Sequence, residues 1–368
     1  MQGMFSFFMP TKVFFGTGCV KDRRANWIMG KKALIVTGRH SAKASGALDD
    51  VIASLPVEYV VFDEVENNPS LETVSQGGKI AREEGCDFVV AIGGGSPLDA
   101  AKAIAVLAVN DVLPLSLYER GWEKPALPIA AIPTTAGTGS EVTQYAVLTV
   151  DRDQTKRSIS GDDLFPKFAL LDPAYTESLS PAVTIDTAVD ALSHLIEGFL
   201  SVRANQVSSG LAVQGMRIWG RCIPALRSRV FDSTVRSELL IASALGGMTI
   251  AQTGTTLVHA LGYPLTYFHD VPHGRANGIL FAAYLRYINQ VAPQKIGEIL
   301  KNLGLTSLNE FQQLMDEFFG EHIAELDIDE ISIAAWVQKA ASAKNVANSI
   351  GNPGPRILEG ILRDSLLR

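Results

Sequence analysis

The feature that most constrains this fold is the alternation of short apolar runs with helical patterns in the first half of the chain. The apolar runs have the length and composition of buried strands and lie at 31–38, 57–65, 87–95 and within 128–142. Helical spacing of apolar residues separates them, at 41–55, 71–85 and 97–109. Strands and helices in this order predict a parallel sheet that is covered by helices on both faces.

The pattern changes at about residue 181. Pro181 predicts the start of a long helix, and further helical runs follow at 205–228, 234–252, 274–289, 294–303 and 309–319. Few strand candidates occur in this half, and the segment 170–181 joins it to the first. We therefore expect an α/β domain over residues 1–180 and an α-helical domain over 181–368, a division that suits a chain of 368 residues.

Charge and cysteine content exclude several classes of partner. The net charge is −7 and no basic cluster occurs, so a nucleic-acid partner is not expected. The three cysteines are far apart and form no Cys-x-x-Cys pair, which fits a reducing cytoplasm. The apolar N-terminus lacks a basic region and a cleavage site, and polar residues interrupt the apolar stretch 239–261. We expect a cytoplasmic protein that binds a small molecule and no membrane.

A glycine-rich turn follows the predicted strand that ends near residue 92. Gly93, Gly94, Gly95 and Ser96 precede Pro97, which predicts the next helix start. Glycines allow close backbone approach, and a helix N-terminus presents unpaired N–H groups, so this segment predicts a phosphate site. It matches neither the Gly-x-Gly-x-x-Gly fingerprint nor a P-loop. The alternative is a tight turn without a ligand.

A second polar loop, PTTAGTGSE at 133–141, follows the next predicted strand. Its hydroxyls and glycines suit the phosphate, ribose or amide of a cofactor, although alone it would be an ordinary loop. Two such loops at the ends of neighbouring strands favour one shared ligand.

One helix of the second half places a carboxylate and an imidazole together. Asp190 and His194 are four residues apart in VDALSHLIEG, so both lie on one helix face. Glu197 follows three residues later, and we interpret it as a helix-surface carboxylate and not as a ligand.

Two further histidines complete a candidate metal site. His259 lies near the end of a helical run that stops before Pro264, and His273 lies where a new helix is expected to start. Three imidazoles and one carboxylate suit a divalent ion such as Fe²⁺ or Zn²⁺. Each histidine could instead be an ordinary core or surface residue, and spacing alone does not show that the four residues meet.

Several motifs occur in order along the chain: GGGSPLDAAKA, PTTAGTGSEVT, LLDP, VDALSHLIEG and HALGYPLTYFHDVPHG. With them the chain resembles the iron-containing (group III) alcohol dehydrogenase family over nearly its whole length, in particular the 1,3-propanediol or broad-range primary alcohol type. The resemblance implies a dehydroquinate synthase-like architecture, with an α/β dinucleotide-binding domain, an all-α metal-binding domain and an active site between them. It also implies a homodimer in which the N-terminal strand can take part.

The activity implied by the resemblance is the interconversion of a primary alcohol, or a small diol, and its aldehyde by hydride transfer to or from NAD(P). The implied metal is Fe²⁺, with Zn²⁺ as the alternative. The implied metal ligands are Asp190, His194, His259 and His273. The implied cofactor contacts are Gly38, Asn68, Gly94, Gly95, Ser96, Asp99, Thr134, Thr135, Thr138, Thr143 and Lys156.

The chain departs from the family pattern at a position proposed to assist proton transfer. Many members carry a histidine four residues after the third metal ligand, where this chain has Tyr263. Either Tyr263 or His269 could replace it as a catalytic proton relay. His269 could equally be an exposed loop residue.

A second departure concerns the cofactor. NAD-preferring members tend to carry Asp at the end of the first strand, where this chain has Gly38 followed by Arg39, His40, Ser41 and Lys43. A missing carboxylate and nearby basic groups favour a 2′-phosphate, so we expect NADP to be preferred over NAD. The alternative is that Gly38 merely makes the turn.

Other readings of the same scaffold remain open. They are a glycerol-dehydrogenase-like polyol oxidoreductase, a dehydroquinate synthase-like lyase, a non-catalytic nucleotide-binding protein, and a structural metal site. The four-residue ligand set favours the iron-type branch, since glycerol dehydrogenases and dehydroquinate synthases generally use three protein ligands.

Overall fold

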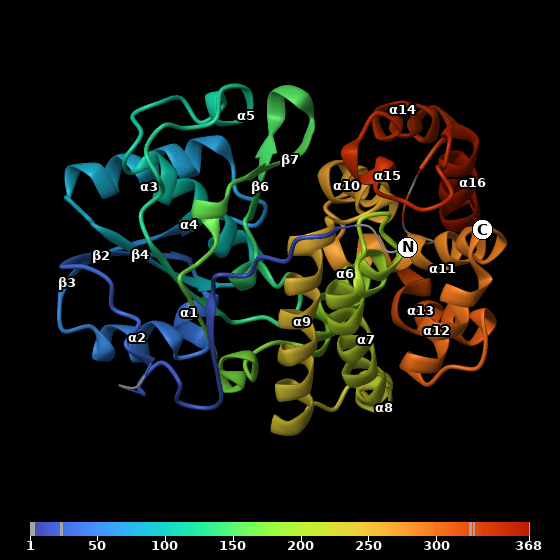
Figure 1. The fold of residues 1–368 in the computed structure, drawn as a ribbon, viewed down its shortest axis with the longest axis horizontal. Coiled ribbons are helices and arrows are strands. Elements are labelled where there is room, and N and C mark those ends of the chain that lie inside the picture. The colour runs from blue at the N-terminus through green and yellow to red at the C-terminus, as the bar shows by residue number, and fades with distance from the viewer. Residues whose placement is uncertain (1–3, 23–24, 324–325, 327, 368) are drawn as a thin grey trace. The chain divides into compact units, whose positions relative to one another are not determined.

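The computed structural model describes residues 4–22, 25–323, 326 and 328–367. The chain forms two compact units, one of residues Met9–Leu179 and one of Ser180–Arg368 together with Met1–Phe8 (Figure 1). Phe8 belongs with the second unit because its backbone N–H and C=O both bond the Gln252 side chain, at 3.1 and 2.8 Å.

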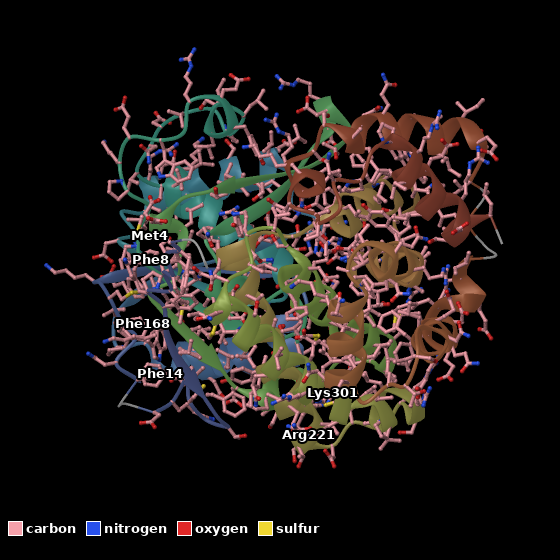
Figure 2. The ribbon with its side chains drawn as sticks, turned by 45° about the vertical axis from the view of Figure 1, so that its right-hand side comes forward. Met4, Phe8, Phe14, Phe168, Arg221 and Lys301 are labelled. Atoms are coloured by element: carbon pink, nitrogen blue, oxygen red, sulfur yellow. The ribbon has the colours of Figure 1, made fainter. Side chains whose placement is uncertain are left out.

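The first unit is built on a six-stranded sheet in the order β1-β8-β5-β4-β2-β3. The strands are β1 (Lys12–Phe15), β2 (Lys32–Gly38), β3 (Glu58–Val65), β4 (Phe88–Gly93), β5 (Ile129–Pro133) and β8 (Phe168–Leu171). All neighbouring pairs are parallel, which confirms the predicted sheet type. At one edge, Phe14 of β1 and Phe168 of β8 stack with ring centroids 6.3 Å apart (Figure 2).

Helices bury both faces of this sheet. They are α1 (Ser41–Ala44), α2 (Ala47–Ser54), α3 (Leu71–Glu83), α4 (Gly95–Leu107) and α5 (Ser116–Glu119). Alternate residues of β2 enter two separate cores: Leu34 packs with Val74 of α3, whereas Ile35 packs with Val51 of α2. Strands buried on both faces explain the uninterrupted apolar runs in the sequence.

Two local features differ from the expected pattern. The helix expected over 41–55 is divided, because Gly46 adopts φ +78° and begins α2 anew. A β-hairpin of β6 (Tyr145–Val150) and β7 (Thr155–Ser160) was not predicted. Strand β6 is apolar and its alternate residues are buried, whereas β7 is largely polar and only Ile159 of it is buried.

The second unit contains helices and no β-strand among its described residues, which confirms the predicted class. Its helices are α6 (Pro181–Leu200), α7 (Gln206–Arg221), α8 (Ile223–Ser228), α9 (Ser233–Thr253), α10 (Leu257–His269), α11 (His273–Val291), α12 (Pro293–Leu303), α13 (Leu308–Ile323), α14 (Glu330–Ala341), α15 (Lys344–Ala347) and α16 (Pro355–Leu366). Helix α6 packs against α7, α9 and α11. It begins as expected at Pro181, where the Ser180 hydroxyl accepts a hydrogen bond from the Val183 N–H.

The helix that carries His259 differs from the expectation. His259 lies in the first turn of α10 and not near a helix end, and Pro264 lies inside this helix. Burial of Leu261 and Leu265 on either side of the proline outweighs the hydrogen bond that proline removes. No helix of the described residues is long and apolar enough to cross a membrane.

Candidate metal centre and cofactor loops

Helix α6 presents three polar side chains inward. Asp190, His194 and Glu197 repeat at helical spacing, and all three are buried. The interpretation of Glu197 as a surface carboxylate is wrong, because α6 is packed on several sides and Glu197 has no exposed surface. Polar groups buried in this way require partners.

Helices α10 and α11 bring the other two histidines to α6. Asp270 adopts φ +52° after α10, and the short turn that follows allows α11 to begin at His273. Gly274 lets α11 approach α6 closely, since a Cβ atom there would overlap the Asp186 carbonyl oxygen.

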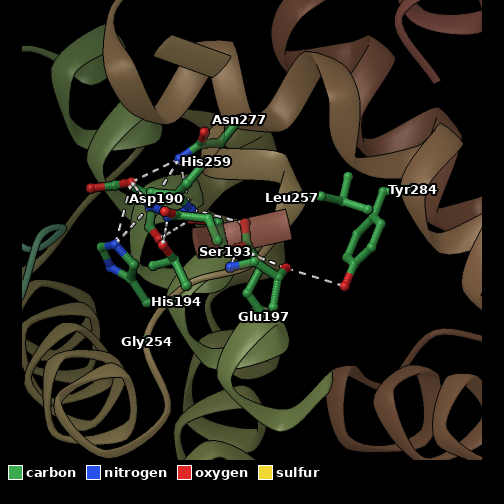
Figure 3. A network of polar contacts seen from close by, with 12 residues as sticks. Asp190, Ser193, His194, Glu197, Gly254, Leu257, His259, Asn277 and Tyr284 are labelled. Atoms are coloured by element: carbon green, nitrogen blue, oxygen red, sulfur yellow. Dashed lines mark hydrogen bonds and ion pairs between the residues drawn. The ribbon is translucent and has the colours of Figure 1, made fainter. Parts of the chain in front are cut away.

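Asp190, His194 and His259 lie close together (Figure 3), and His273 lies near the same carboxylate. Asp190 Oδ1 lies 3.9, 4.0 and 3.7 Å from Nε2 of His194, His259 and His273. The Nε2 atoms of His194 and His259 are 3.1 Å apart. Two donors that bind one cation at about 2.1 Å in a tetrahedral arrangement lie roughly 3.4 Å apart. Ligand atoms of Asp190, His259 and His273 all lie within 4.8 Å of one another, so these three residues fit a single divalent ion, and His194 lies beside them.

The charge of the cluster also suits a cation. Burial would raise the pKa of Asp190, but His194, His273 and His259 oppose it more strongly, and the resulting pKa is lower than usual. Asp190 is therefore ionised at neutral pH, the form in which a carboxylate binds metal. Asn277, fully buried, lies one turn after His273 and donates to Asp190 Oδ1 at 3.2 Å.

Glu197 extends the cluster on the side of His259. Its Oε1 lies 2.8 Å from His259 Nδ1, and its Oε2 accepts hydrogen bonds from the backbone N–H and the hydroxyl of Thr256. The Thr256 hydroxyl in turn lies 3.2 Å from the Tyr284 hydroxyl. The sequence signal for Glu197 was its spacing of three from His194, and Thr256 gave none.

The two candidates for proton transfer lie in different surroundings. The Tyr263 ring stacks on His273 with centroids 5.9 Å apart. His269 is the last residue of α10, and its ring packs edge-on against Trp336 at 5.8 Å. Tyr263 thus contacts a candidate ligand, whereas the ring contact of His269 is with a side chain of α14.

In the first unit the glycine-rich turn forms the start of α4. Gly93 adopts φ +146°, and α4 begins at Gly95 without a capping side chain. The N-terminal N–H groups of a helix bind anions, so this end of α4 fits a phosphate. The Ser96 hydroxyl accepts a hydrogen bond from the Asn68 N–H at 3.1 Å.

The Thr-rich loop lies beside this helix start, because β4 and β5 are paired neighbours. A Cβ atom at Gly95 would lie 2.6 Å from the Thr138 side chain, and one at Gly94 would lie 3.2 Å from Thr135. The Thr134 side chain is buried, and its hydroxyl oxygen has no hydrogen-bond partner among the described residues.

A buried lysine missed in the sequence joins the two loops. Lys102 Nζ donates to the Ser140 carbonyl and hydroxyl oxygens, at 2.7 and 2.8 Å, and to Thr143 Oγ1 and the Tyr145 carbonyl, at 3.1 and 2.7 Å. Asp99 accepts from the Ser140 hydroxyl at 2.5 Å. Asp99 and Thr143, two expected cofactor contacts, therefore have partners within the protein.

Burial changes the acid–base behaviour of this cluster. It lowers the pKa of Lys102 to about 8, although the negative charges of Asp99 and Glu141 act to raise it. It raises the pKa of Glu141 to about 7, although a backbone hydrogen bond and Lys102 favour the ionised form. The pKa of Asp99 is also raised by burial, with Lys102 acting in the opposite direction.

The remaining expected cofactor contacts lie at the end of β2 (Gly38), between β3 and α3 (Asn68) and in β7 (Lys156). Lys156 Nζ lies 2.6 Å from Asn68 Oδ1, so these two residues are paired. A Cβ atom at Gly38 would lie 3.1 Å from the Val65 carbonyl oxygen, which is a tight contact. Lys43 pairs with Asp63 at 3.0 Å, whereas Arg39 is exposed.

Both halves of the chain are similar to known proteins. The family model of iron-containing alcohol dehydrogenases matches residues 10–173, and that of the C-terminal domain of the same family matches residues 184–363. A 1,3-propanediol dehydrogenase of Klebsiella pneumoniae is 32% identical and is aligned over 95% of each chain. Alcohol dehydrogenase 4 of Saccharomyces cerevisiae is 33% identical over 83% of this chain and 81% of its own.

Solved structures agree with these sequence matches. An iron-containing alcohol dehydrogenase of Thermotoga maritima superposes with a TM-score of 0.90 at 39% identity, covering 99% of this chain and 100% of its own. A sulfoacetaldehyde reductase of Bifidobacterium kashiwanohense, solved with NAD⁺, gives a TM-score of 0.88 at 28% identity, with 99% of each chain covered. The chain belongs to the iron-containing alcohol dehydrogenase family and is an oxidoreductase.

Proposed function

We propose that this protein interconverts a primary alcohol, or a small diol, and the corresponding aldehyde by hydride transfer to or from a nicotinamide cofactor. The observation that carries the proposal is the convergence of Asp190, His259 and His273, with His194 beside Asp190 and His259. Family membership supports it, since relatives named alcohol dehydrogenase and 1,3-propanediol dehydrogenase match most of the chain.

The four ligands would hold one divalent cation, with Fe²⁺ expected before Zn²⁺. When bound, such an ion would supply Lewis acidity to the substrate oxygen. Asp190 contributes the only negative charge among these four residues, while the imidazoles bind as neutral donors. Burial of Asp190 and His259 excludes water from their side of the cluster.

The nicotinamide cofactor is proposed to bind at the two loops of the first unit. The uncapped start of α4 at Gly95 would receive the pyrophosphate. The Thr134 hydroxyl is suitably placed in the adjoining loop to accept or donate a hydrogen bond. Lys102, Asp99 and Thr143 would hold the loops in place.

We further propose that NADP is preferred over NAD. Gly38 leaves no carboxylate beside the ribose, and Arg39 is exposed after it. Lys43 is already paired with Asp63, so Arg39 is the expected partner of a 2′-phosphate. Comparison of kcat/KM with the two cofactors tests this, and a clear preference for NAD would refute it.

Tyr263 is our proposed proton relay, because its ring stacks on His273. His269 is the second candidate, although its ring contact is with Trp336. Tyr263→Phe should lower kcat while the metal affinity stays unchanged. If His269→Ala lowers kcat and Tyr263→Phe does not, the roles are reversed.

A homodimer and a cytoplasmic location complete the proposed function. Strand β1 lies at the sheet edge with Phe15 exposed, and Met4, Phe5 and Phe7 are also exposed. An exposed edge strand can pair with a second copy of the chain, so we propose a homodimer. Light scattering should then give twice the mass of one chain. Three buried free thiols agree with a reducing cytoplasm.

The decisive experiment is a panel of primary alcohols, diols, polyols and aldehydes, assayed with NAD(H) and NADP(H) after anaerobic loading with Fe²⁺ or Zn²⁺. Turnover of primary alcohols supports the proposal. Turnover confined to polyols would indicate a glycerol-dehydrogenase-like enzyme. Absence of any turnover with the metal bound would indicate a non-catalytic nucleotide-binding protein or a structural metal site.

A further inference from the structure

Glu197 has a restricted choice of hydrogen-bond partners. A carboxylate accepts hydrogen bonds and donates none. The Thr256 backbone N–H can only donate, and it donates to Oε2 of Glu197. The other oxygen, Oε1, lies 2.8 Å from His259 Nδ1. For this second contact to be a hydrogen bond, the proton must reside on Nδ1 of His259.

The position of that proton determines what the opposite edge of the ring can do. A neutral imidazole carries one proton, so a protonated Nδ1 leaves a lone pair on Nε2. Nε2 is the atom of His259 that faces Asp190 and His194, at 4.0 and 3.1 Å. With the proton on Nε2 instead, His259 could not act as a ligand at this cluster.

We propose that Glu197 is a positioning residue that holds His259 in the Nδ1–H tautomer and thereby directs its Nε2 lone pair into the metal cluster. The proposal rests on the metal site of the proposed function, but the tautomer itself is a property of the metal-free protein. Thr256 fixes the carboxylate through its N–H and hydroxyl. Because Glu197 is fully buried, water does not compete for either oxygen.

Glu197→Gln is a sharp test, because the amide has nearly the same shape but only one accepting oxygen. The Thr256 N–H requires that oxygen, so the amide NH₂ would face His259 Nδ1 and force the proton to Nε2. We expect the dissociation constant for Co²⁺ or Zn²⁺, measured by competition with a chelator, to rise by about 10- to 100-fold. If the dissociation constant changes by about twofold or less, far below the expected loss, the proposal is overturned.

Tyr284→Phe is the matched control, since it removes a buried hydroxyl from the same chain of contacts. Thr256 can still donate to Glu197 after this change, so the metal affinity should remain that of the unsubstituted protein. An equal loss in both variants would show that the network acts only through stability, and would overturn the assignment.

The tautomer can also be read without any substitution. Nitrogen-15 spectra of the metal-free protein labelled at histidine should show a protonated Nδ1 for His259, assigned by comparison with His259→Gln. A protonated Nε2 there would overturn the proposal, even if Glu197→Gln fails to fold. Failure of the proposed function looks different: the unsubstituted protein would then bind no Co²⁺ or Zn²⁺ at this cluster, whatever its tautomer.

Discussion

Gly274 makes the close approach of α11 to α6 possible, so its replacement should disturb the metal cluster from outside. In Gly274→Ala the new Cβ would overlap the Asp186 carbonyl oxygen and lie 2.9 Å from Asp190 Cβ, where ordinary contact begins at 3.4 Å. Relief of the overlap with the carbonyl oxygen requires the two helices to separate locally by roughly 1.5 Å, judged against the usual contact distance. Metal–ligand distances tolerate only about 0.2 Å.

Two quantities should therefore change together. Overpacking of this kind costs roughly 1–3 kcal/mol of unfolding free energy, which urea unfolding measures. Since His273 precedes Gly274, displacement of α11 should also weaken metal binding by about tenfold or more, on the scale seen when ligand supports are removed. Metal titration of the folded variant measures this loss.

Gly297→Ala is the control for the helical substitution itself. Gly297 lies in α12 with nothing within 4 Å of its added Cβ, so alanine should be neutral or stabilise by up to about 1 kcal/mol. If Gly274→Ala matched Gly297→Ala in both stability and metal affinity, the close packing of α11 on α6 would not be what positions His273.

Three further changes test other parts of the structure. His273→Ala should abolish metal binding but leave nucleotide affinity unchanged in calorimetry; retained metal binding would remove His273 from the site. Burial raises the pKa of Glu141 to about 7 from 4.5, so the stability this group contributes is fully present below pH 4.5 and is lost as the pH rises through 7. Glu141→Gln should therefore remove up to about 3 kcal/mol of pH dependence over this window, and an unchanged profile in urea unfolding would contradict the shift. Lys102→Met leaves Asp99 and two carbonyl groups without their buried cation and should cost about 3–5 kcal/mol; a loss below about 1 kcal/mol, the scale of an exposed ion pair, would show that the cluster is dispensable.

Much of the fold follows from local pattern. Strands buried on both faces are apolar without interruption, as at Ala33–Val36, so they and the helices between them were predicted. The β6–β7 hairpin was missed, because β7 is largely polar and only Ile159 of it is buried, so no second apolar run marked the pair. His259 was assigned to the wrong part of its helix, because Pro264 suggested a helix end that tertiary packing overrides.

The metal ligands could be nominated from the sequence, but their meeting depends on tertiary contacts. The spacing of Asp190 and His194 places both on one helix face, whereas the position of His273 depends on the turn at Asp270 and on Gly274. The roles of Glu197 and Lys102 were not foreseen, because each bonds residues that are distant in the chain.

The central claim is that Asp190, His194, His259 and His273 bind one divalent cation on which alcohol oxidation depends. Anaerobic titration of the metal-free protein with Fe²⁺, followed at each point by the rate of alcohol oxidation, tests it most directly. We expect the rate to rise linearly and to reach a plateau at one bound ion per chain. A full rate in the metal-free protein, or a plateau unaffected by substitution of all four ligands with alanine, would contradict the account.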